Sequence, residues 1–133
     1  MSAPVGSLGE WAVAQYLCQN GCFVVQQNCR ADGQWHDEID IVACDGVYLR
    51  FVEVKTRTRG AVIPALSAVT AAKQRRIQRC ARAFLQHNES FRCYQPRFDV
   101  ACVTAYRGKV EAIQYYPCLL YTSPSPRDRQ KSR

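Results

Sequence analysis

Two apolar, strand-like runs on either side of Asp45-Gly46 constrain this chain most. The first covers residues 38–43 and the second covers residues 48–55. An Asp-Gly pair between two such runs predicts an antiparallel hairpin. Because successive strand residues point to opposite faces, Glu53 and Lys55 share one face, and the valines on either side of Glu53 take the other. The hairpin therefore presents charged side chains from a pair of otherwise apolar strands.

The register of this hairpin predicts an acidic cluster. If Asp45-Gly46 is a two-residue loop, Glu38 falls opposite Glu53 and Asp40 lies diagonal to it on the same face. Directly opposed like charges destabilise a sheet, so such a cluster needs a cation. Mg²⁺ suits it, because this ion takes oxygen ligands and often uses one or two carboxylates together with substrate phosphates.

Lys55 completes a set that suits the hydrolysis of a phosphate ester. A metal ion at the carboxylates polarises the phosphate and lowers the pKa of a bound water, and Lys55 then orients that water or neutralises developing charge. The alternative is a solvated strand face with cross-strand ion pairs, which a short motif alone does not exclude. The apolar opposite face, with Ile39, Ile41, Val52 and Val54, indicates core strands and favours the metal site.

The remaining periodicity predicts a single α/β domain. Helices are expected over residues 6–20 and from Ser67 or Thr70 to Gln86, and further strands over residues 22–28, 98–106 and 110–116. The order α-β-β-β-α-β-β predicts a mixed central sheet of about five strands flanked by helices. A length of 133 residues fits one domain.

Charge and cysteine usage point to a reduced protein with a polyanionic partner. The formal net charge is +7, which suggests nucleic acid without identifying it. Eight cysteines are present, but the N-terminus lacks a signal-peptide pattern, which argues against a secreted, disulfide-rich protein. The sequence contains no Cys-x-x-Cys pair, so a zinc site is not expected. No apolar run is long enough to span a bilayer. We expect a cytoplasmic protein without a membrane segment.

The last segment, residues 118–133, breaks the composition abruptly. One interpretation is a disordered basic tail, since Ser, Pro and Arg build no core. The other is an artefact, because residues 118–128 read as the in-frame translation of a widely used transposon-based sequencing adapter. We then expect the native domain to be residues 1–117. The charged residues of 118–133 sum to +3, which leaves +4 for that domain.

The chain resembles the PD-(D/E)xK nucleases at Asp40 and Glu53-Val-Lys55, with Ile39 in place of the usual proline. A wider pattern is similar to the bacterial YraN family, also called UPF0102. It comprises Gly9-Glu10, Ala14, Tyr16-Leu17, Gly21, Asn28, Arg30, residues 38–42, residues 51–57, residues 73–77 and residues 97–100. One departure is the longer stretch before Glu38, which contains Trp35 and puts the local turn in question.

This resemblance implies a restriction-endonuclease-like fold, similar in layout to archaeal Holliday-junction resolvases. It implies metal binding and catalysis by Asp40 and Glu53, catalysis by Lys55, and a further metal-binding carboxylate at Glu10 on the first helix. Glu38 is either a fourth ligand or a supporting neighbour. A helix-dipole role is the alternative for Glu10.

Basic residues are expected to contact the nucleic-acid backbone. The candidates are Lys73 and Arg76 on the second helix and Arg57 after the second hairpin strand; a solvated helix face is the alternative for Lys73. Such contacts position a duplex without reading its sequence.

Three functions are consistent with this pattern. The first is Mg²⁺- or Mn²⁺-dependent phosphodiester hydrolysis on branched or damaged DNA, and a resolvase-like role would require a homodimer, since two strands are cut. The second is a non-catalytic nucleic-acid-binding adaptor of the same fold in a DNA-processing complex. The third is a protein-interaction domain with a structural acidic cluster. The complete Asp40, Glu53 and Lys55 set favours the first.

Overall fold

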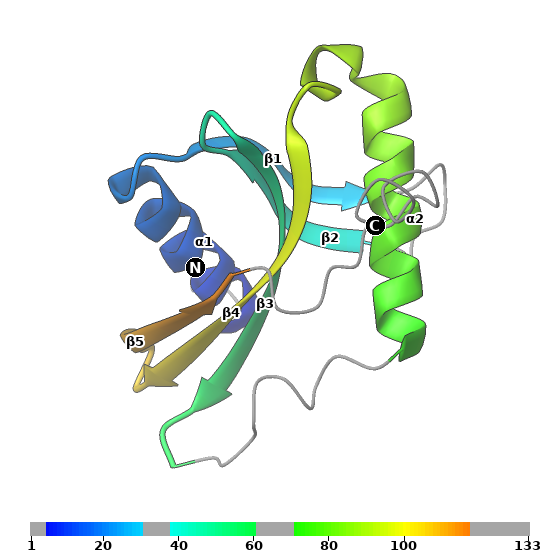
Figure 1. Cartoon of the computed structure of the whole chain (residues 1–133). Coiled ribbons are helices and arrows are strands. Elements are labelled where there is room, and N and C mark those ends of the chain that lie inside the picture. Colours follow the sequence, from blue (N-terminus) through cyan, green and yellow to red (C-terminus); the bar gives the residue numbers. More distant parts are fainter. Residues whose placement is uncertain (1–4, 31–37, 61–70, 118–133) are drawn as a thin grey trace, which may run out of the picture.

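The computed structural model describes residues 5–30, 38–60 and 71–117. The predicted order of helices and strands is confirmed (Figure 1). The elements are α1 (Val5–Gln19), β1 (Phe23–Arg30), β2 (Glu38–Cys44), β3 (Tyr48–Thr58), α2 (Ala71–His87), the short 3₁₀ helix η2 (Glu89–Phe91), β4 (Gln95–Tyr106) and β5 (Lys109–Tyr116).

The five strands form one mixed sheet in the spatial order β1-β2-β3-β4-β5. Neighbouring strands are antiparallel except β3 and β4, which run parallel over eleven paired positions and are connected through α2. A parallel pair needs such a crossover because its strands start at the same edge of the sheet. This confirms the predicted mixed sheet of five strands flanked by helices.

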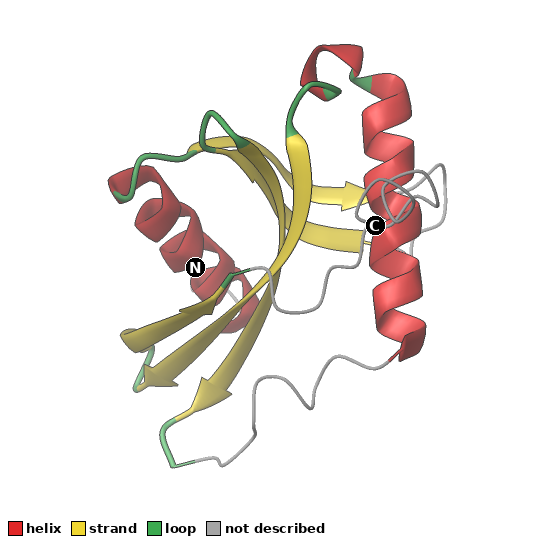
Figure 2. Cartoon of the chain, viewed as in Figure 1, coloured by secondary structure: helices red, strands yellow, loops and turns green. Residues whose placement is uncertain are grey.

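The two helices cover opposite faces of the sheet (Figure 2). On one face, Val13 and Leu17 of α1 pack with Val52 and Ala101. On the other, Ile77 and Phe84 of α2 pack with a second buried cluster. The sheet residues of that second cluster are Ile39, Val42, Leu49, Phe51, Phe98, Val100 and Cys102. We refer below to the α1 face and the α2 face of the sheet.

Helix α2 buries one stripe against the sheet. Ile77, Cys80, Ala81 and Phe84 are buried at the i, i+3, i+4 and i+7 spacing of an amphipathic helix. Phe84 meets Phe51 of β3 edge to face, with ring centroids 6.0 Å apart. Helix α2 is described from Ala71 onward. The predicted starts at residues 67 and 70 lie outside the described residues.

Helix α1 ends where the sequence predicts. Gly21 has a φ of +87°, and the N–H of Cys22 donates to the carbonyl oxygen of Leu17 at 2.9 Å, which satisfies the last turn. The sequence pattern predicts a broad apolar stripe on this helix, formed by Leu8, Trp11, Val13, Ala14, Tyr16 and Leu17. The prediction was wrong at Trp11, whose exposed fraction is 61%. The buried line is narrow and consists of Val13, Ala14 and Leu17.

The register predicted for the β2–β3 hairpin was wrong by two residues. Cys44 pairs with Leu49 and Ile41 with Val52, so Cys44 does not face Val47. The cause is Asp45, whose Oδ1 accepts the N–H groups of Val47 and Tyr48 at 3.0 and 2.7 Å. With this Asx-type turn, four residues (45–48) separate the paired Cys44 and Leu49, where the prediction had two between Cys44 and Val47.

Strand β3 is longer than predicted. It runs to Thr58, so Arg57 lies in the strand, where a loop was expected from residue 57. The sequence predicts a loop at residues 88–96 between the second helix and the strand that starts at residue 98. This stretch contains η2, and β4 already begins at Gln95. The tail at 118–133 and the unusual stretch around Trp35 lie outside the described residues.

Candidate functional site

The site begins where the β2–β3 ladder ends. Ile41 and Val52 form the last backbone pair, and beyond it Asp40 Oδ2 accepts the N–H of Val54 at 2.8 Å. A side-chain carboxylate thus takes the place of a backbone carbonyl as the partner of β3. This bond brings the Asp40 carboxylate to the segment of β3 that contains Glu53 and Lys55.

Glu53 and Lys55 lie on the α2 face of the sheet. They alternate with Val52 and Val54, which pack on the α1 face, and they follow Phe51, which packs under α2. Glu53 is only 6% exposed. Lys55 Nζ lies 3.4 Å from Glu53 Oε2, so the buried carboxylate and the more exposed lysine form an ion pair.

Arg57 continues this face of β3. Arg57 pairs with Thr104 of β4, and Lys55 pairs with Cys102. Burial raises the pKa of the Cys102 thiol, and the positive charges of Arg57 and Lys55 partly oppose that rise. The two cations therefore act on the same part of the α2 face.

Helix α1, which carries Glu10, packs on the face of the sheet opposite to Glu53 and Lys55. Gly9, the neighbour of Glu10, packs so closely on β3 that a Cβ at this position would lie 2.1 Å from Thr56 Oγ1. Glu10 is half-buried beside this contact. By strand alternation Thr56 points to the α1 face, whereas Lys55 points to the α2 face. The close approach at Gly9 thus fixes α1 against the strand that supplies the lysine.

Across residues 5–30, 38–60 and 71–117, no group of three or more His, Cys, Asp and Glu side chains is arranged to hold a metal ion. Glu10 does not form such a group with Asp40 and Glu53, and its metal role stays a prediction. Glu38 lies opposite Arg30 in the β1–β2 ladder, not opposite Glu53 as predicted. The observed β2–β3 register, continued by one residue, brings Asp40 to the level of Glu53.

Three predicted site residues are located only by their position in the fold. Glu38 begins β2, and Lys73 and Arg76 lie in the first turns of α2. Their side chains lie outside the described part of the structure. The assignments of Glu38 to metal and of Lys73 and Arg76 to nucleic acid therefore stay predictions.

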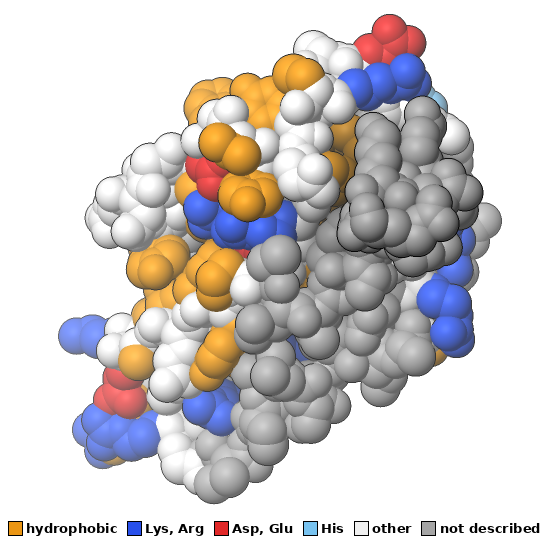
Figure 3. Space-filling view, viewed as in Figure 1, with side chains coloured by type: hydrophobic (Ala, Val, Ile, Leu, Met, Phe, Trp, Pro, Cys, Tyr) orange, Lys and Arg blue, Asp and Glu red, His pale blue; other side chains and the backbone are white. Residues whose placement is uncertain are grey.

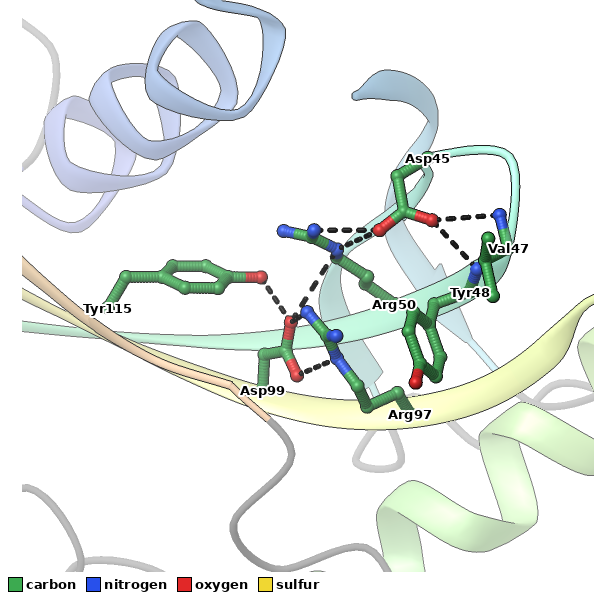
Figure 4. Close-up of polar contacts among 7 residues, drawn as sticks. All are labelled: Asp45, Val47, Tyr48, Arg50, Arg97, Asp99 and Tyr115. Atoms are coloured by element: carbon green, nitrogen blue, oxygen red, sulfur yellow. Dashed lines mark hydrogen bonds and ion pairs between the residues drawn. The ribbon is translucent and has the colours of Figure 1, made fainter. Parts of the chain in front are cut away.

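A second polar cluster lies on the α1 face and centres on Asp99, which is fully buried (Figure 4). Arg97 donates to both carboxylate oxygens, from Nε at 2.9 Å and from Nη2 at 3.0 Å. The Tyr115 hydroxyl donates to Asp99 Oδ2, and Arg50 Nε lies 4.0 Å from the same oxygen. Burial raises the pKa of Tyr115 above its usual value, and the nearby Asp99 adds to this rise.

The cluster extends to the hairpin loop through Arg50. Its Nε and Nη2 donate to Asp45 Oδ2 at 3.0 and 2.7 Å. Although burial alone raises the pKa of Asp45, the N–H groups of Tyr48 and Val47 together with Arg50 lower it to about 2. Arg97 and Asp99 stand at the predicted start of a strand, where the sequence favours a local ion pair, and the structure confirms that pair. The sequence did not predict the wider network. Charged residues at alternating positions of a buried strand were the available signal.

These features define a small α/β protein with a carboxylate–lysine set at the end of a hairpin ladder. The family model described as "Uncharacterised protein family UPF0102" matches residues 9–103. The chain therefore belongs to UPF0102, which confirms the resemblance seen in its sequence.

Individual relatives agree with this assignment. A UPF0102 protein of Geobacter metallireducens is 39% identical over 85% of this chain and 88% of its own length. A UPF0102 protein of Synechococcus sp. is 41% identical over 83% and 80% of the two chains.

A solved structure was also matched. It is Archaeoglobus fulgidus Hjc, described as a Holliday junction resolvase, with 17% identity, a TM-score of 0.44, and coverage of 81% of this chain and 72% of that chain. Among the helices described, none has the length and apolar character needed to cross a membrane.

Proposed function

We propose that this protein binds nucleic acid and hydrolyses phosphodiester bonds of DNA in a reaction that depends on a divalent metal ion. Branched or damaged DNA is the proposed substrate, and the cytoplasm the proposed compartment. The proposed catalytic residues are Asp40, Glu53 and Lys55, carried by two neighbouring strands of the mixed sheet.

One observation supports this proposal most. The hydrogen bond from the Val54 N–H to Asp40 Oδ2 ties one carboxylate to the segment that carries a second carboxylate and a lysine. Both strands are held by the sheet, so the three groups are positioned by rigid elements. Rigid positioning of this kind is what a site for phosphoryl chemistry requires.

The donor set of the site fits Mg²⁺. Asp40 and Glu53 offer carboxylate oxygens, the hard ligands that this ion prefers, and Mg²⁺ commonly needs only one or two carboxylates from the protein. Asp40 and Glu53 would hold the ion, with Glu10 and Glu38 as further candidates. When bound, Mg²⁺ or Mn²⁺ would supply charge to polarise the scissile phosphate and to lower the pKa of a water.

The residues of the chain itself supply the remaining functions. Lys55 Nζ is a strong donor beside Glu53, and its proposed role is to hold a phosphate oxygen or the attacking water while negative charge develops. Arg57, Lys73 and Arg76 are proposed to contact phosphates of the backbone. Cutting two strands of a junction would further require a homodimer.

The second candidate is a non-catalytic nucleic-acid-binding adaptor of the same fold. The ion pair between Lys55 Nζ and Glu53 Oε2 favours it, because a lysine held by a buried carboxylate also has a purely structural explanation. Removal of one partner of a largely buried pair is costly whatever its function.

Purified protein incubated with plasmid, linear, single-stranded and four-way-junction DNA, with Mg²⁺ or Mn²⁺, tests the proposal. We expect cleavage of at least one substrate. The variant Lys55→Ala should abolish cleavage and retain most DNA binding, and Arg92→Ala, an exposed arginine outside the site, should retain both. Binding without cleavage by the wild type would establish the adaptor. Absence of binding to DNA or RNA at low salt would exclude both candidates.

We also propose that residues 1–117 are the native domain and that 118–133 derive from adapter sequence. The original nucleotide read decides this directly. An adapter match that begins at the codon for Cys118 supports the proposal, and a genomic sequence that continues through codon 133 overturns it.

A further inference from the structure

We infer that Lys55, Arg57 and Arg59 form a phosphate-binding track on the α2 face of β3 and hold one nucleic-acid backbone that leads away from Glu53. The nature of the partner rests on the proposed function. The arrangement of the three cations rests on β3 alone.

Strand geometry aligns the three cations. Residues two apart on a strand share a face, so Glu53, Lys55, Arg57 and Arg59 follow one another on the same side. The N–H of Arg59 donates to the carbonyl oxygen of Ala105 at 3.0 Å, which continues the pairing with β4 past the end of β3 at Thr58. The backbone that carries the track therefore stays paired with β4 as far as Arg59.

The spacing of the cations suits a phosphate backbone. At about 3.3 Å per strand residue, neighbouring members of the track are about 6.6 Å apart, and the whole track spans about 13 Å. This repeat is close to the separation of successive phosphates along one nucleic-acid strand. A strand that places one phosphate at Glu53 and Lys55 would thus meet Arg57 and Arg59 with its next phosphates.

The outer end of the track is held in place. The Arg59 guanidinium lies 3.9 Å from the centroid of the Tyr106 ring and forms an ion pair with Glu111. The Arg59 side chain nevertheless remains 57% exposed. A guanidinium that is already ordered loses less conformational entropy when it binds a phosphate.

The tip of the sheet around Arg59 is net positive. The Arg107 guanidinium lies 5.2 Å from the centroid of the same Tyr106 ring, and Lys109 follows in β5. These two cations and Arg59 outnumber Glu111. Figure 3 shows Lys and Arg side chains at the lower left of the molecule, with acidic side-chain atoms beside them. A polyanion would be attracted to this tip.

Helix α2 offers a competing basic surface. Arg75, Arg79 and Arg82 are exposed at the i, i+4 and i+7 positions of one stripe. The opposite side of α2 packs on the sheet through Ile77 and Phe84. This arginine stripe therefore faces away from Glu53 and provides a matched control.

Binding of fluorescein-labelled duplex and single-stranded DNA, followed by anisotropy in EDTA between 50 and 200 mM salt, tests the track. Arg57→Ala/Arg59→Ala should weaken binding at low salt about tenfold and reduce the slope of log K against log salt by about 1.8 on duplex DNA, which corresponds to two lost contacts. Arg75→Ala/Arg82→Ala, with the same change of charge, should keep the slope.

Two further variants guard against a folding defect. Arg57→Lys/Arg59→Lys should keep most of the salt slope, because point charges suffice for phosphate contacts. Glu111→Gln should tighten binding about threefold, since it removes the acid paired with Arg59. Wild-type affinity and slope in Arg57→Ala/Arg59→Ala, or an equal loss in Arg75→Ala/Arg82→Ala, would overturn the track and leave the proposed function standing. A wild type that binds no nucleic acid at 50 mM salt would overturn both.

Discussion

The carboxylate of Asp40 accepts the backbone N–H of Val54 at 2.8 Å, so a side chain of β2 completes the hydrogen bonding of β3. This single contact serves both the fold and the proposed chemistry. It explains why an acidic residue is tolerated within a hairpin of the core. The Asp40 carboxylate gives the Val54 N–H an acceptor, and a buried N–H without a partner is costly. The contact also separates the effects expected from different substitutions of Asp40.

Asp40→Ala should destabilise the protein by about 1–3 kcal/mol, because the N–H of Val54 loses its acceptor in a partly buried setting. Asp40→Asn keeps an acceptor oxygen and should cost less. Both should remove the proposed metal-dependent cleavage, since both remove the charge. Urea unfolding at constant m-value measures the first effect. Equal destabilisation by the two variants would show that the bond to Val54 is unimportant.

Asp99→Ala should destabilise the protein by about 3–5 kcal/mol, because Arg97 is left as a largely buried charge without its bidentate partner. Thermal and urea unfolding test this. DNA affinity of the folded variant should be unchanged, since the cluster lies on the α1 face. A loss below 1 kcal/mol would mean that Arg97 finds water or another partner.

Acid should lower the free energy of unfolding, because protonation of Asp45 removes the charge that holds the hairpin loop. The pKa of Asp45 in the folded state is about 2, below the usual 3.8, so its contribution is complete above pH 4 and is lost as the pH falls towards 2. For a partly solvated group this contribution is about 1–2 kcal/mol. The difference in unfolding free energy between the wild type and Asp45→Asn should shrink over this range. A difference that stays constant from pH 5 to pH 2 would contradict the assignment.

Gly9→Ala should destabilise the protein by about 1–3 kcal/mol, because the new Cβ would overlap with Thr56 Oγ1 at 2.1 Å. Thr56→Ala removes that oxygen and leaves the Thr56 Cβ at an acceptable 3.4 Å. The double variant should therefore be more stable than the sum of the two single changes predicts. Simple additivity in a double-mutant cycle would show that α1 moves away from β3 instead.

The shared face of Glu53 and Lys55 could be predicted because it depends only on strand alternation. The two-residue error in register did not disturb it, since an even shift leaves Glu53 and Lys55 on the same face. The prediction was wrong for Ile39, which was expected opposite them with Ile41 and instead packs in the cluster under α2. The error did change the neighbours, from Glu38 opposite Glu53 to Asp40 at that level. It arose because the Asp45 side chain, not the Asp-Gly pair alone, sets the length of the loop.

The network around Asp99 could not be predicted in full. Arg97 and Asp99 are neighbours in β4, but Arg50 comes from β3 and Tyr115 from β5. Their meeting depends on the order and pairing of strands that are distant in the sequence. Burial of Arg97 and Asp99 follows from the same pairing, which the hydropathy of single residues does not reveal.

The sequence by itself determined the succession of elements, the faces of the strands and membership of UPF0102, because periodicity, turn residues and family pattern are local properties of the chain. Only the tertiary structure decided the hairpin register, the extension of β3 to Thr58 and the side of the sheet on which α1 carries Glu10. Those depend on which hydrogen-bonding groups and which apolar surfaces meet across the sheet, and these contacts join residues far apart in the chain.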